Sequence, residues 1–468
     1  MTTATLTAPA RLRHSRDALA HSVSADAWRR SLRMRSADAT LAVSVRVGLA
    51  AAIVLVVFGL AGHGTVAGFA VLGSLASAFS RHEPLRRTAQ KVGFVGSFVV
   101  VAVLAGGLIA LTGAPLWAQV GLMALVSGGG AAVLFGFRVA GPGPVVLVFA
   151  ATAAVGYVSS VATLGVAVLC AAIGATVGFV TALVPFAFLP WGPARLAAAR
   201  ALAAVAAVPD GADVGAAHAA ISSAREKLAL TSGSVRRHEA RDLAAVLSEA
   251  ECALDEWERG AGARLRDIVR HEKELRKIKR HKAILGGFGD IPVLPRPTPF
   301  LADGLARLRR HDVLTNAARV VLAAAAAGWL ASAIGLDHPL WASMGAMAAL
   351  QGVTYGPTVQ RAIQRLLGNV GGAVIAAALI ALSLGYWQSV IVVAIMQTGA
   401  EVMAPRNYAL CSIFVTPMAL LVVGLGATVD PAIGVSRVLD TLVGVVVGVV
   451  VAAVTISRSD RTHLPAVA

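Results

Sequence analysis

Charged residues, aromatic residues and cysteines are all scarce in this chain of 468 residues. Only 14% of the residues are charged and 5% are aromatic, and the three cysteines, Cys170, Cys252 and Cys411, lie far apart in the sequence. Their spacing matches neither a zinc site nor a disulfide framework. No Gly-x-x-x-x-Gly-Lys-Ser/Thr loop and no Ser/His/Asp or zinc-hydrolase signature occurs. We therefore expect no enzyme activity, no ATP-driven transport, no metal and no other cofactor.

Apolar residues, by contrast, are abundant. They make up 57% of the chain, and the mean hydropathy of +0.74 lies outside the range of soluble globular proteins. An apolar helix needs about 20 residues to cross a bilayer. The sequence therefore predicts an all-α membrane protein with twelve spans, several of them short for a full crossing. The predicted spans are 41–61, 65–80, 92–112, 116–136, 142–160, 163–188, 314–335, 339–355, 367–385, 387–403, 408–427 and 432–456.

Residues of the first six spans recur in the same order in the second six. Arg46 corresponds to Arg319, and Trp117 corresponds to Trp387. A duplicated multi-span block is a common plan of transporters and channels. Because six spans return the chain to its starting side, the two blocks are predicted to be parallel six-span repeats. They occupy residues 41–190 and 313–457.

Most of the charge gathers between the two blocks. Residues 191–312 hold 21 of the 41 Lys and Arg and 16 of the 25 Asp and Glu. This window is predicted to be a water-facing helical domain, followed by a linker at 286–299. Its helices are expected near 193–208, 212–231, 236–258 and 262–283.

The cation-rich stretch 264–282 of this domain has two interpretations that stay open. It is either a solvated helix face or a surface that contacts anionic lipid. Nucleic acid is not expected as a partner, because aromatic stacking residues are missing around these cations.

Loop charges set the expected orientation. The predicted outer loops contain no Lys or Arg, whereas the inner loops contain Arg86, Arg138 and Arg406. Cytoplasmic loops carry the excess of positive charge in membrane proteins. We therefore expect a multi-pass protein of the bacterial plasma (inner) membrane, in contact with the lipid bilayer. The tails 1–40 and 458–468 and the domain 191–312 should all be cytoplasmic.

Two carboxylates, Glu401 and Asp440, lie near or inside the predicted spans. An ionisable group in a membrane costs roughly 2.5–3.5 kcal/mol on insertion scales and is a functional candidate. Asp440 follows Arg437 by three residues, so the two side chains can share a helix face. They form either a proton-linked switch that frees Arg437 for an anion or a static ion pair. Glu401 is a second candidate for proton coupling or an interfacial residue that faces inner water.

Arginines outnumber carboxylates in the spans, so the pathway should prefer negative solutes. Arg46 and Arg319, at matching positions of the two blocks, are candidates to attract an anion. Snorkelling of both side chains to the lipid headgroups is the alternative. The motifs Gly174-x-x-x-Gly178 and Gly444-x-x-x-Gly448 are typical of close helix packing.

Three motifs in the second block resemble those of the fusaric-acid-resistance and aromatic-acid-exporter proteins. Arg361-Ala-Ile-Gln-Arg365-Leu-Leu-Gly368 is similar to the Arg-x-x-x-Arg-x-x-Gly signature of that family. The segment from Tyr408 to Thr416-Pro417 resembles its Tyr…Phe-x-Thr-Pro segment. The third, Arg437-Val-Leu-Asp440-Thr441-Leu-Val-Gly444, resembles its closing Arg-x-x-Asp-Thr-x-x-Gly. This chain departs from the pattern at Asn369, where the family usually has Thr.

The resemblance implies proton-driven export of aromatic or other organic carboxylates, and it adds Arg361 and Arg365 to the expected anion pathway. It also suggests kinship with plant aluminium-activated malate channels, in which six-span units pair around a pore, so a homo-oligomer is a further possibility. The function that we expect is secondary export of a small organic anion. The alternatives are a passive anion channel of the same fold and a membrane scaffold without transport activity.

Overall fold

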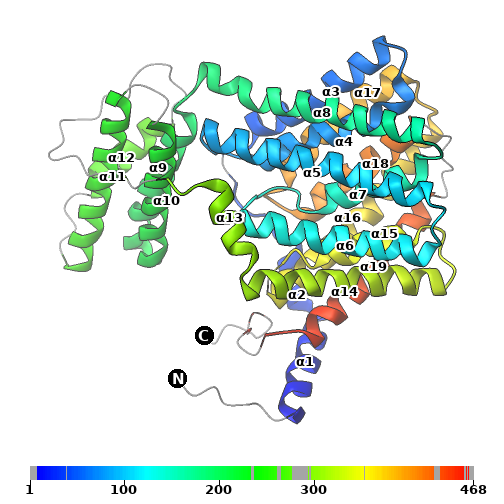
Figure 1. Ribbon diagram of the computed structural model, residues 1–468. Coiled ribbons are helices and arrows are strands. Elements are labelled where there is room, and N and C mark those ends of the chain that lie inside the picture. The colour runs from blue at the N-terminus through cyan, green and yellow to red at the C-terminus, as the bar shows by residue number, and fades with distance from the viewer. Residues whose placement is uncertain are drawn as a thin grey trace. The chain divides into compact units, whose positions relative to one another are not determined.

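The computed structural model describes residues 8–37, 39–232, 237–260, 265–276, 294, 297–352, 354–425, 433–457, 460 and 462. Every regular element in these residues is a helix (Figure 1). The chain divides into two compact units, which are described separately. Unit 1 consists of Met1–Phe79, Val92–Thr181 and Gly304–Ala468, and unit 2 consists of Ser80–Lys91 and Ala182–Asp303.

Unit 1 is built from two sets of helices that follow the same order. The first set is α3 (Leu41–Leu60), α4 (Ala67–Ser74) between the 3-10 turns η1 (Gly64–Val66) and η2 (Leu75–Phe79), α5 (Leu85–Leu111), α6 (Leu116–Gly136), α7 (Val145–Tyr157) and α8 (Val161–Phe188). The second set is α14 (His311–Ala333), α15 (Pro339–Ala349), α16 (Tyr355–Ala381), α17 (Tyr386–Met403), α18 (Tyr408–Gly424) and α19 (Ile433–Val454). Helices α1 (Ala8–Ser22) and α2 (Ala25–Leu32) precede the first set, and α13 (Phe300–Leu308) precedes the second.

Seven of these helices are long and apolar enough to cross a membrane, namely α3, α5, α6, α8, α14, α16 and α19. The others are shorter. With a rise of about 1.5 Å per residue, α4 and α15 fall well short of a hydrocarbon layer about 30 Å thick. The predicted spans 65–80 and 339–355, which were short for a full crossing in the sequence, are accordingly short helices in the structure. Both segments are almost wholly buried by protein, so their apolar runs pack in the core instead of meeting lipid.

Equivalent helices of the two sets pack in equivalent ways. Helix α3 contacts α4 as α14 contacts α15, and α6 contacts α7 as α17 contacts α18. Helices of the two sets also pack against each other: α3 contacts α17, and α14 contacts α6. Glycines permit the second kind of contact, since a Cβ on Gly48 would meet Thr398 and a Cβ on Gly128 would meet Val321. Two copies of one helical unit related by a twofold axis would show this arrangement.

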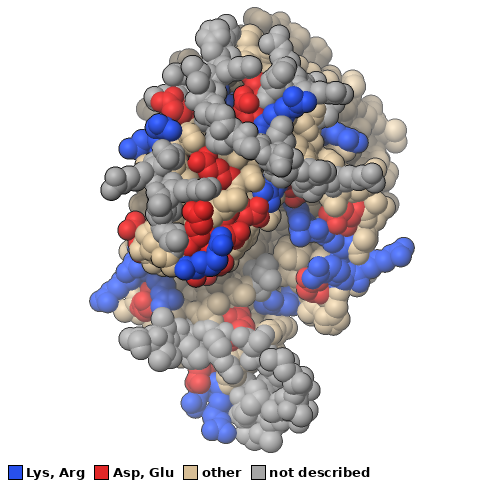
Figure 2. Space-filling view, turned by 90° about the vertical axis from the view of Figure 1, so that its left-hand side faces the viewer, with Lys and Arg blue, Asp and Glu red and all other residues tan. Residues whose placement is uncertain are grey.

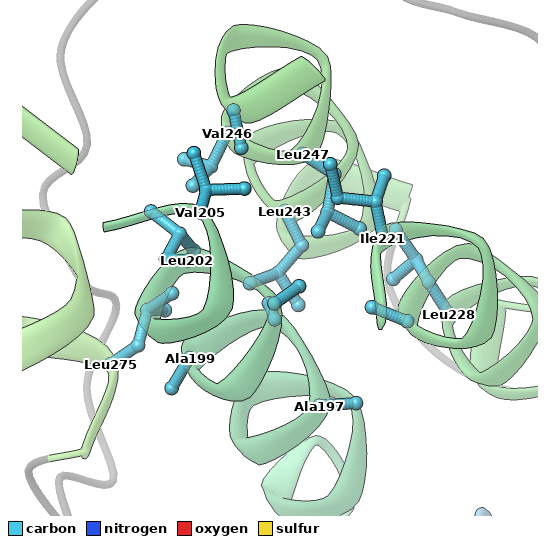
Figure 3. Packing of buried hydrophobic residues seen from close by; sticks show 14 of the residues in the cluster. Ala197, Ala199, Leu202, Val205, Ile221, Leu228, Leu243, Val246, Leu247 and Leu275 are labelled. Carbon is cyan, nitrogen blue, oxygen red and sulfur yellow. The ribbon is translucent and has the colours of Figure 1, made fainter. Parts of the chain in front are cut away.

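Unit 2 is centred on a helical bundle whose elements match the predicted amphipathic helices. They are α9 (Gly192–Ala206), the turn η3 (Val208–Asp210), α10 (Val214–Ser232), α11 (Arg237–Glu258) and α12 (Leu265–Arg276). Leu202, Leu228 and Leu247 point into its apolar core (Figure 3). Of the linker predicted at 286–299, only residues 294 and 297–299 are described, and the cation-rich stretch 264–282 is described at 265–276, which is α12.

Ion pairs hold the surface of unit 2 together. Arg225 of α10 forms a two-pronged pair with Glu251 of α11, with nitrogen–oxygen distances of 3.1 and 2.5 Å. The segment Ser80–Lys91 joins the unit through Arg87, whose Nη2 lies 3.6 Å from Glu226. On the face of the molecule shown in Figure 2, cationic and anionic side chains are interspersed. This mixture of signs does not form a single-sign patch on that face.

Candidate functional site

Buried and half-buried polar and aromatic side chains gather where α15, α16, α18 and α19 meet. We call them the polar column and divide them into three layers. The Arg365 layer contains Arg361, Arg365 and Tyr408; the Asn369 layer contains Asn369, Thr416 and Thr441; the Arg437 layer contains Arg437, Asp440, Trp341 and His338. Arg365 and Asn369 lie one turn apart on α16, as do Arg437 and Thr441 on α19, so the layers follow one another along the helices.

The Asn369 layer is a hydrogen-bonded bridge between three helices. The Asn369 amide nitrogen donates to Thr441 Oγ1 at 2.6 Å, and the amide oxygen accepts a bond from Thr416 Oγ1 at 2.8 Å. All three side chains are at most 3% exposed. Because buried polar groups need partners, this bridge fixes α16, α18 and α19 relative to one another.

The Arg365 layer is organised around Tyr408. Arg365 is 5% exposed and donates from Nη1 to the Tyr408 hydroxyl at 3.0 Å, while its buried Nε has no hydrogen-bond partner in the described part of the chain. The Arg361 guanidinium lies 3.9 Å from the centroid of the Tyr408 ring, a cation–π distance. Arg361 also donates to the carbonyl oxygen of Ala348 at 3.1 Å and to the side chain of Gln351. It thereby satisfies a carbonyl at the C-terminal end of α15, where a cation is favourable.

The Arg437 layer holds two buried charged side chains, those of Arg437 and Asp440. Asp440 is fully buried and Arg437 is 5% exposed. Both Asp440 oxygens, and Nε and Nη1 of Arg437, lack hydrogen-bond partners among the described residues. The predicted common helix face therefore holds the two residues, yet no static ion pair joins them. The Arg437 guanidinium lies 4.4 Å from the ring centroid of Trp341, and His338 stacks on the same ring at 4.2 Å with an interplanar angle of 10°.

Glu401, the second carboxylate predicted from the sequence, is in α17 and lies outside the polar column. It is 4% exposed and accepts a bond from Gln397 Nε2 at 3.3 Å, one turn earlier on the same helix. Burial within the protein rules out the alternative of an interfacial residue that faces water.

Arg46 and Arg319 are half-buried and each is held within its own set of helices. Arg46 donates to the carbonyl oxygen of Ser77 in η2 at 3.1 Å, and Arg319 donates from Nε to Thr455 Oγ1 at 2.8 Å. The matching positions in the sequence thus have different partners. No described contact brings the two guanidiniums together.

The four predicted packing glycines lie against the two short buried helices. Gly174 and Gly178 of α8 face α4, and Gly444 and Gly448 of α19 face α15. In each case an added Cβ would meet a backbone carbonyl oxygen of the short helix, those of Ala70, Ser74, Ala342 and Ala346 in that order. The close approach of α19 to α15 brings Arg437 over Trp341.

Several residues of the column were not singled out from the sequence. Thr416 and Tyr408 stood inside a motif, but nothing in the sequence indicated that they meet Asn369 and Arg365. Trp341 lies at the start of an apolar run, and the sequence did not indicate that Arg437 would lie over its ring. These contacts join helices far apart in the chain, and helical periodicity within one segment carries no information about them.

One group of possible metal ligands occurs among the described residues. His218, Asp255 and Glu258 of unit 2 place one ligand atom each within 4.8 Å of one another. Both carboxylates belong to partly or fully exposed residues on a helix surface, and exposed acidic groups commonly lie close together without binding an ion. The polar column contains one carboxylate and several cations, a donor set that suits an anion better than a metal.

These features define a class of protein. Seven membrane-length apolar helices and a buried, arginine-containing polar column are those of a multi-pass helical membrane protein. Residues 324–451 match the sequence family described as fusaric acid resistance protein-like. The match includes all three layers and confirms the resemblance drawn from the three motifs.

The chain is also similar to an uncharacterized membrane protein of Bacillus subtilis (strain 168), YvaC. The two sequences are 30% identical over 161 residues, which make up 33% of this chain and 25% of that protein. The chain therefore matches about a quarter of the length of this relative. No solved structure matches the chain.

Proposed function

We propose that this chain is a secondary transporter that exports small organic anions of the aromatic carboxylate class across the bacterial plasma membrane. In this proposal the two helix sets are parallel repeats, and both termini and the bundle of unit 2 are cytoplasmic. The carrying observation is the Arg437 layer, where a buried guanidinium and a buried carboxylate both lack hydrogen-bond partners in the described residues.

The unsatisfied donors of Arg437 favour an anionic solute. A buried donor without a partner costs about 1–3 kcal/mol, and a carboxylate is the acceptor that a guanidinium fork fits best. The Trp341 ring, which packs against both Arg437 and His338, gives the site an aromatic wall beside the guanidinium. An aromatic carboxylate combines the two complementary parts. Arg365 with its free Nε supplies a second cation farther along the column.

Asp440 is suited to make transport depend on protons. An ionised carboxylate buried without hydrogen bonds is costly, and its charge balances that of Arg437. When Asp440 takes up a proton, Arg437 retains an unbalanced charge that an anion can neutralise.

A passive anion channel is the second candidate. It is favoured by the continuity of the column, in which polar layers follow one another at intervals of one helical turn. Export and conduction differ in counterflow, because a carrier accelerates uptake of labelled solute when unlabelled solute is loaded on the opposite side. A channel does not couple the two fluxes.

Counterflow in proteoliposomes therefore tests the proposal. We expect the purified wild-type protein to accelerate uptake of labelled benzoate into vesicles loaded with unlabelled benzoate. Arg437→Gln should abolish this flux. Arg310→Gln removes the same charge from an exposed residue that pairs with Asp312 and should retain it. Equal flux in both variants would remove Arg437 from the pathway, and flux without counterflow would favour the channel.

A further inference from the structure

The segment before the first long helix, residues 24–35, is held in place by unit 1. Ser24 caps α2 by accepting a bond from the Ala27 amide at 3.2 Å. The Ser31 carbonyl oxygen accepts bonds from Gln364 Nε2 at 2.8 Å and from Asn407 Nδ2 at 3.0 Å. Ala27 and Ser31, one turn apart, are buried. One face of α2 is thus fixed against the ends of α16 and α18.

A second face of the segment is apolar but exposed. Trp28 and Leu32 lie one turn apart and are 39% and 62% exposed, and Met34 is 55% exposed. A tryptophan and a leucine beside each other on a short helix are costly in water. Trp is typical of membrane interfaces, where its ring lies at the level of the headgroups.

Arginines flank this apolar face. Arg30 is paired with Asp26 at 2.7 Å, and Arg35 donates to Gln360 at 3.2 Å. Arg29 and Arg33 are different, since they are exposed and have no hydrogen-bond or ion-pair partner in the described part of the chain. They lie one turn apart, so two free guanidiniums stand beside the exposed apolar pair.

We propose that residues 24–35 form a binding surface for anionic phospholipid. Trp28 and Leu32 enter the boundary between headgroups and acyl chains, and Arg29 and Arg33 bind the phosphates of acidic lipids. An apolar stripe with adjoining cations is the pattern by which interfacial helices bind anionic membranes. Guanidiniums match phosphate oxygens in a two-pronged geometry.

The lipid-binding surface is connected to the polar column through neighbouring residues. Gln364 and Asn407, which bind the Ser31 carbonyl, are the chain neighbours of Arg365 and Tyr408. Lipid bound at Arg29 and Arg33 therefore stabilises the segment that packs directly beside the Arg365 layer. The proposal does not depend on which solute is transported or on whether transport occurs.

A label at position 32 tests it directly. The full-length chain with Cys170, Cys252 and Cys411 replaced by alanine and with Leu32→Cys is labelled with an environment-sensitive fluorophore. It is placed in nanodiscs of phosphatidylcholine alone or with phosphatidylglycerol, each containing a spin-labelled quencher lipid. We expect quenching to be about twofold stronger with phosphatidylglycerol, as interfacial helices respond to lipid charge. A label at Leu104→Cys, an exposed apolar position of α5, reports correct insertion in every sample.

Charge variants then identify the groups responsible. Arg29→Gln/Arg33→Gln should lose the difference between the two lipid mixtures. Arg241→Gln/Arg259→Gln, which changes net charge equally at exposed residues of the bundle, should keep it. Equal quenching in both mixtures, or a difference that survives loss of Arg29 and Arg33, would overturn the proposal.

Discussion

Asn369 shows how one side chain can set the geometry of a membrane site. Its amide binds a hydroxyl on each of two other helices, and one of these, Thr441, is the chain neighbour of Asp440. In an apolar interior each of these hydroxyls has few other partners. Asn369 therefore positions the helix that carries Arg437 and Asp440, although it is not itself charged.

Replacement of Asn369 by leucine should destabilise the protein. It leaves two buried hydroxyls without the amide, and an unsatisfied buried group costs about 1–3 kcal/mol. Thermal unfolding in detergent measures the effect. Asn316→Leu is the matched control, because the Asn316 Oδ1 is buried and already lacks a partner in the described residues. Equal unfolding temperatures for the two variants would show that the bridge contributes no stability.

His338 gives the protein a dependence on acid pH. Its burial, with a further contribution from Arg437, lowers its pKa below the usual 6.5, while Asp337 acts in the opposite direction. The unfolded chain then binds more protons than the folded one as pH falls below 6.5, so folding stability decreases there. Above 6.5 both states are neutral at this residue and the contribution is constant.

We expect the unfolding temperature of the wild type to fall between pH 7.5 and pH 5.5, and His338→Gln to reduce that fall. His63→Gln, at an exposed residue, serves as the comparison and should leave the fall unchanged. If the unfolding temperature falls by the same amount in the wild type and in His338→Gln, the pH dependence does not come from His338.

At the scale of elements, hydrophobic runs predicted where helices occur but not how far each one reaches. The expected segments 116–136 and 387–403 match α6 and α17 within one residue. The runs at 65–80 and 339–355 were equally apolar, yet they fold into short buried helices. A helix buried inside the protein and a helix surrounded by lipid both consist of apolar residues, so hydropathy does not distinguish between them. Glycine spacing was more informative, because Gly174 and Gly444 do contact these short helices.

The docking of α2 on α16 could not be predicted in this way. It depends on the carbonyl of Ser31 meeting the side chains of Gln364 and Asn407, more than 300 residues away. Every residue has a backbone carbonyl, so the residue type at position 31 does not indicate that this carbonyl accepts two hydrogen bonds. The same holds for the polar column: its motifs could be recognised in the sequence, but the contacts between those motifs could not be predicted.

Two neighbouring glycines test the contact between α6 and α14. A Cβ on Gly128 would lie 2.8 Å from the Ala317 carbonyl oxygen and would also meet Val321, whereas Gly129 has open space around its Cβ position. Gly128→Ala should destabilise the protein by about 1–3 kcal/mol through overpacking. Gly129→Ala should be neutral or stabilise it by up to about 1 kcal/mol. Unfolding in detergent measures both, and an equal response would mean that the helices are not in contact there.

At the scale of the whole molecule, the reciprocal packing of α3 on α17 and of α14 on α6 supports the duplicated plan inferred from the sequence. Helices of each set therefore bury part of their surface against helices of the other set. The polar column belongs to the second set alone, where Arg437 and Asp440 have no charged equivalents in the first. The family match, residues 324–451, likewise lies within the second set.

Single-cysteine labelling in intact cells tests the orientation. Cysteines at positions 63 and 338 should react with an impermeant maleimide from outside, because the predicted outer loops contain no Lys or Arg. A cysteine at position 225, in the bundle of unit 2, should react only after the cells are permeabilised. Reaction at position 225 in intact cells would reverse the orientation.

The central claim is that Asp440 couples anion export to protons through Arg437. Its most direct test is benzoate flux into proteoliposomes as a function of internal and external pH, for the wild type and for Asp440→Asn. The substitution keeps the shape of the side chain but removes its titration. We predict that the flux of the wild type changes with the pH gradient and that Asp440→Asn transports benzoate at a rate that does not. If Asp440→Asn retains the pH profile of the wild type, Asp440 is structural and the account of coupling is wrong.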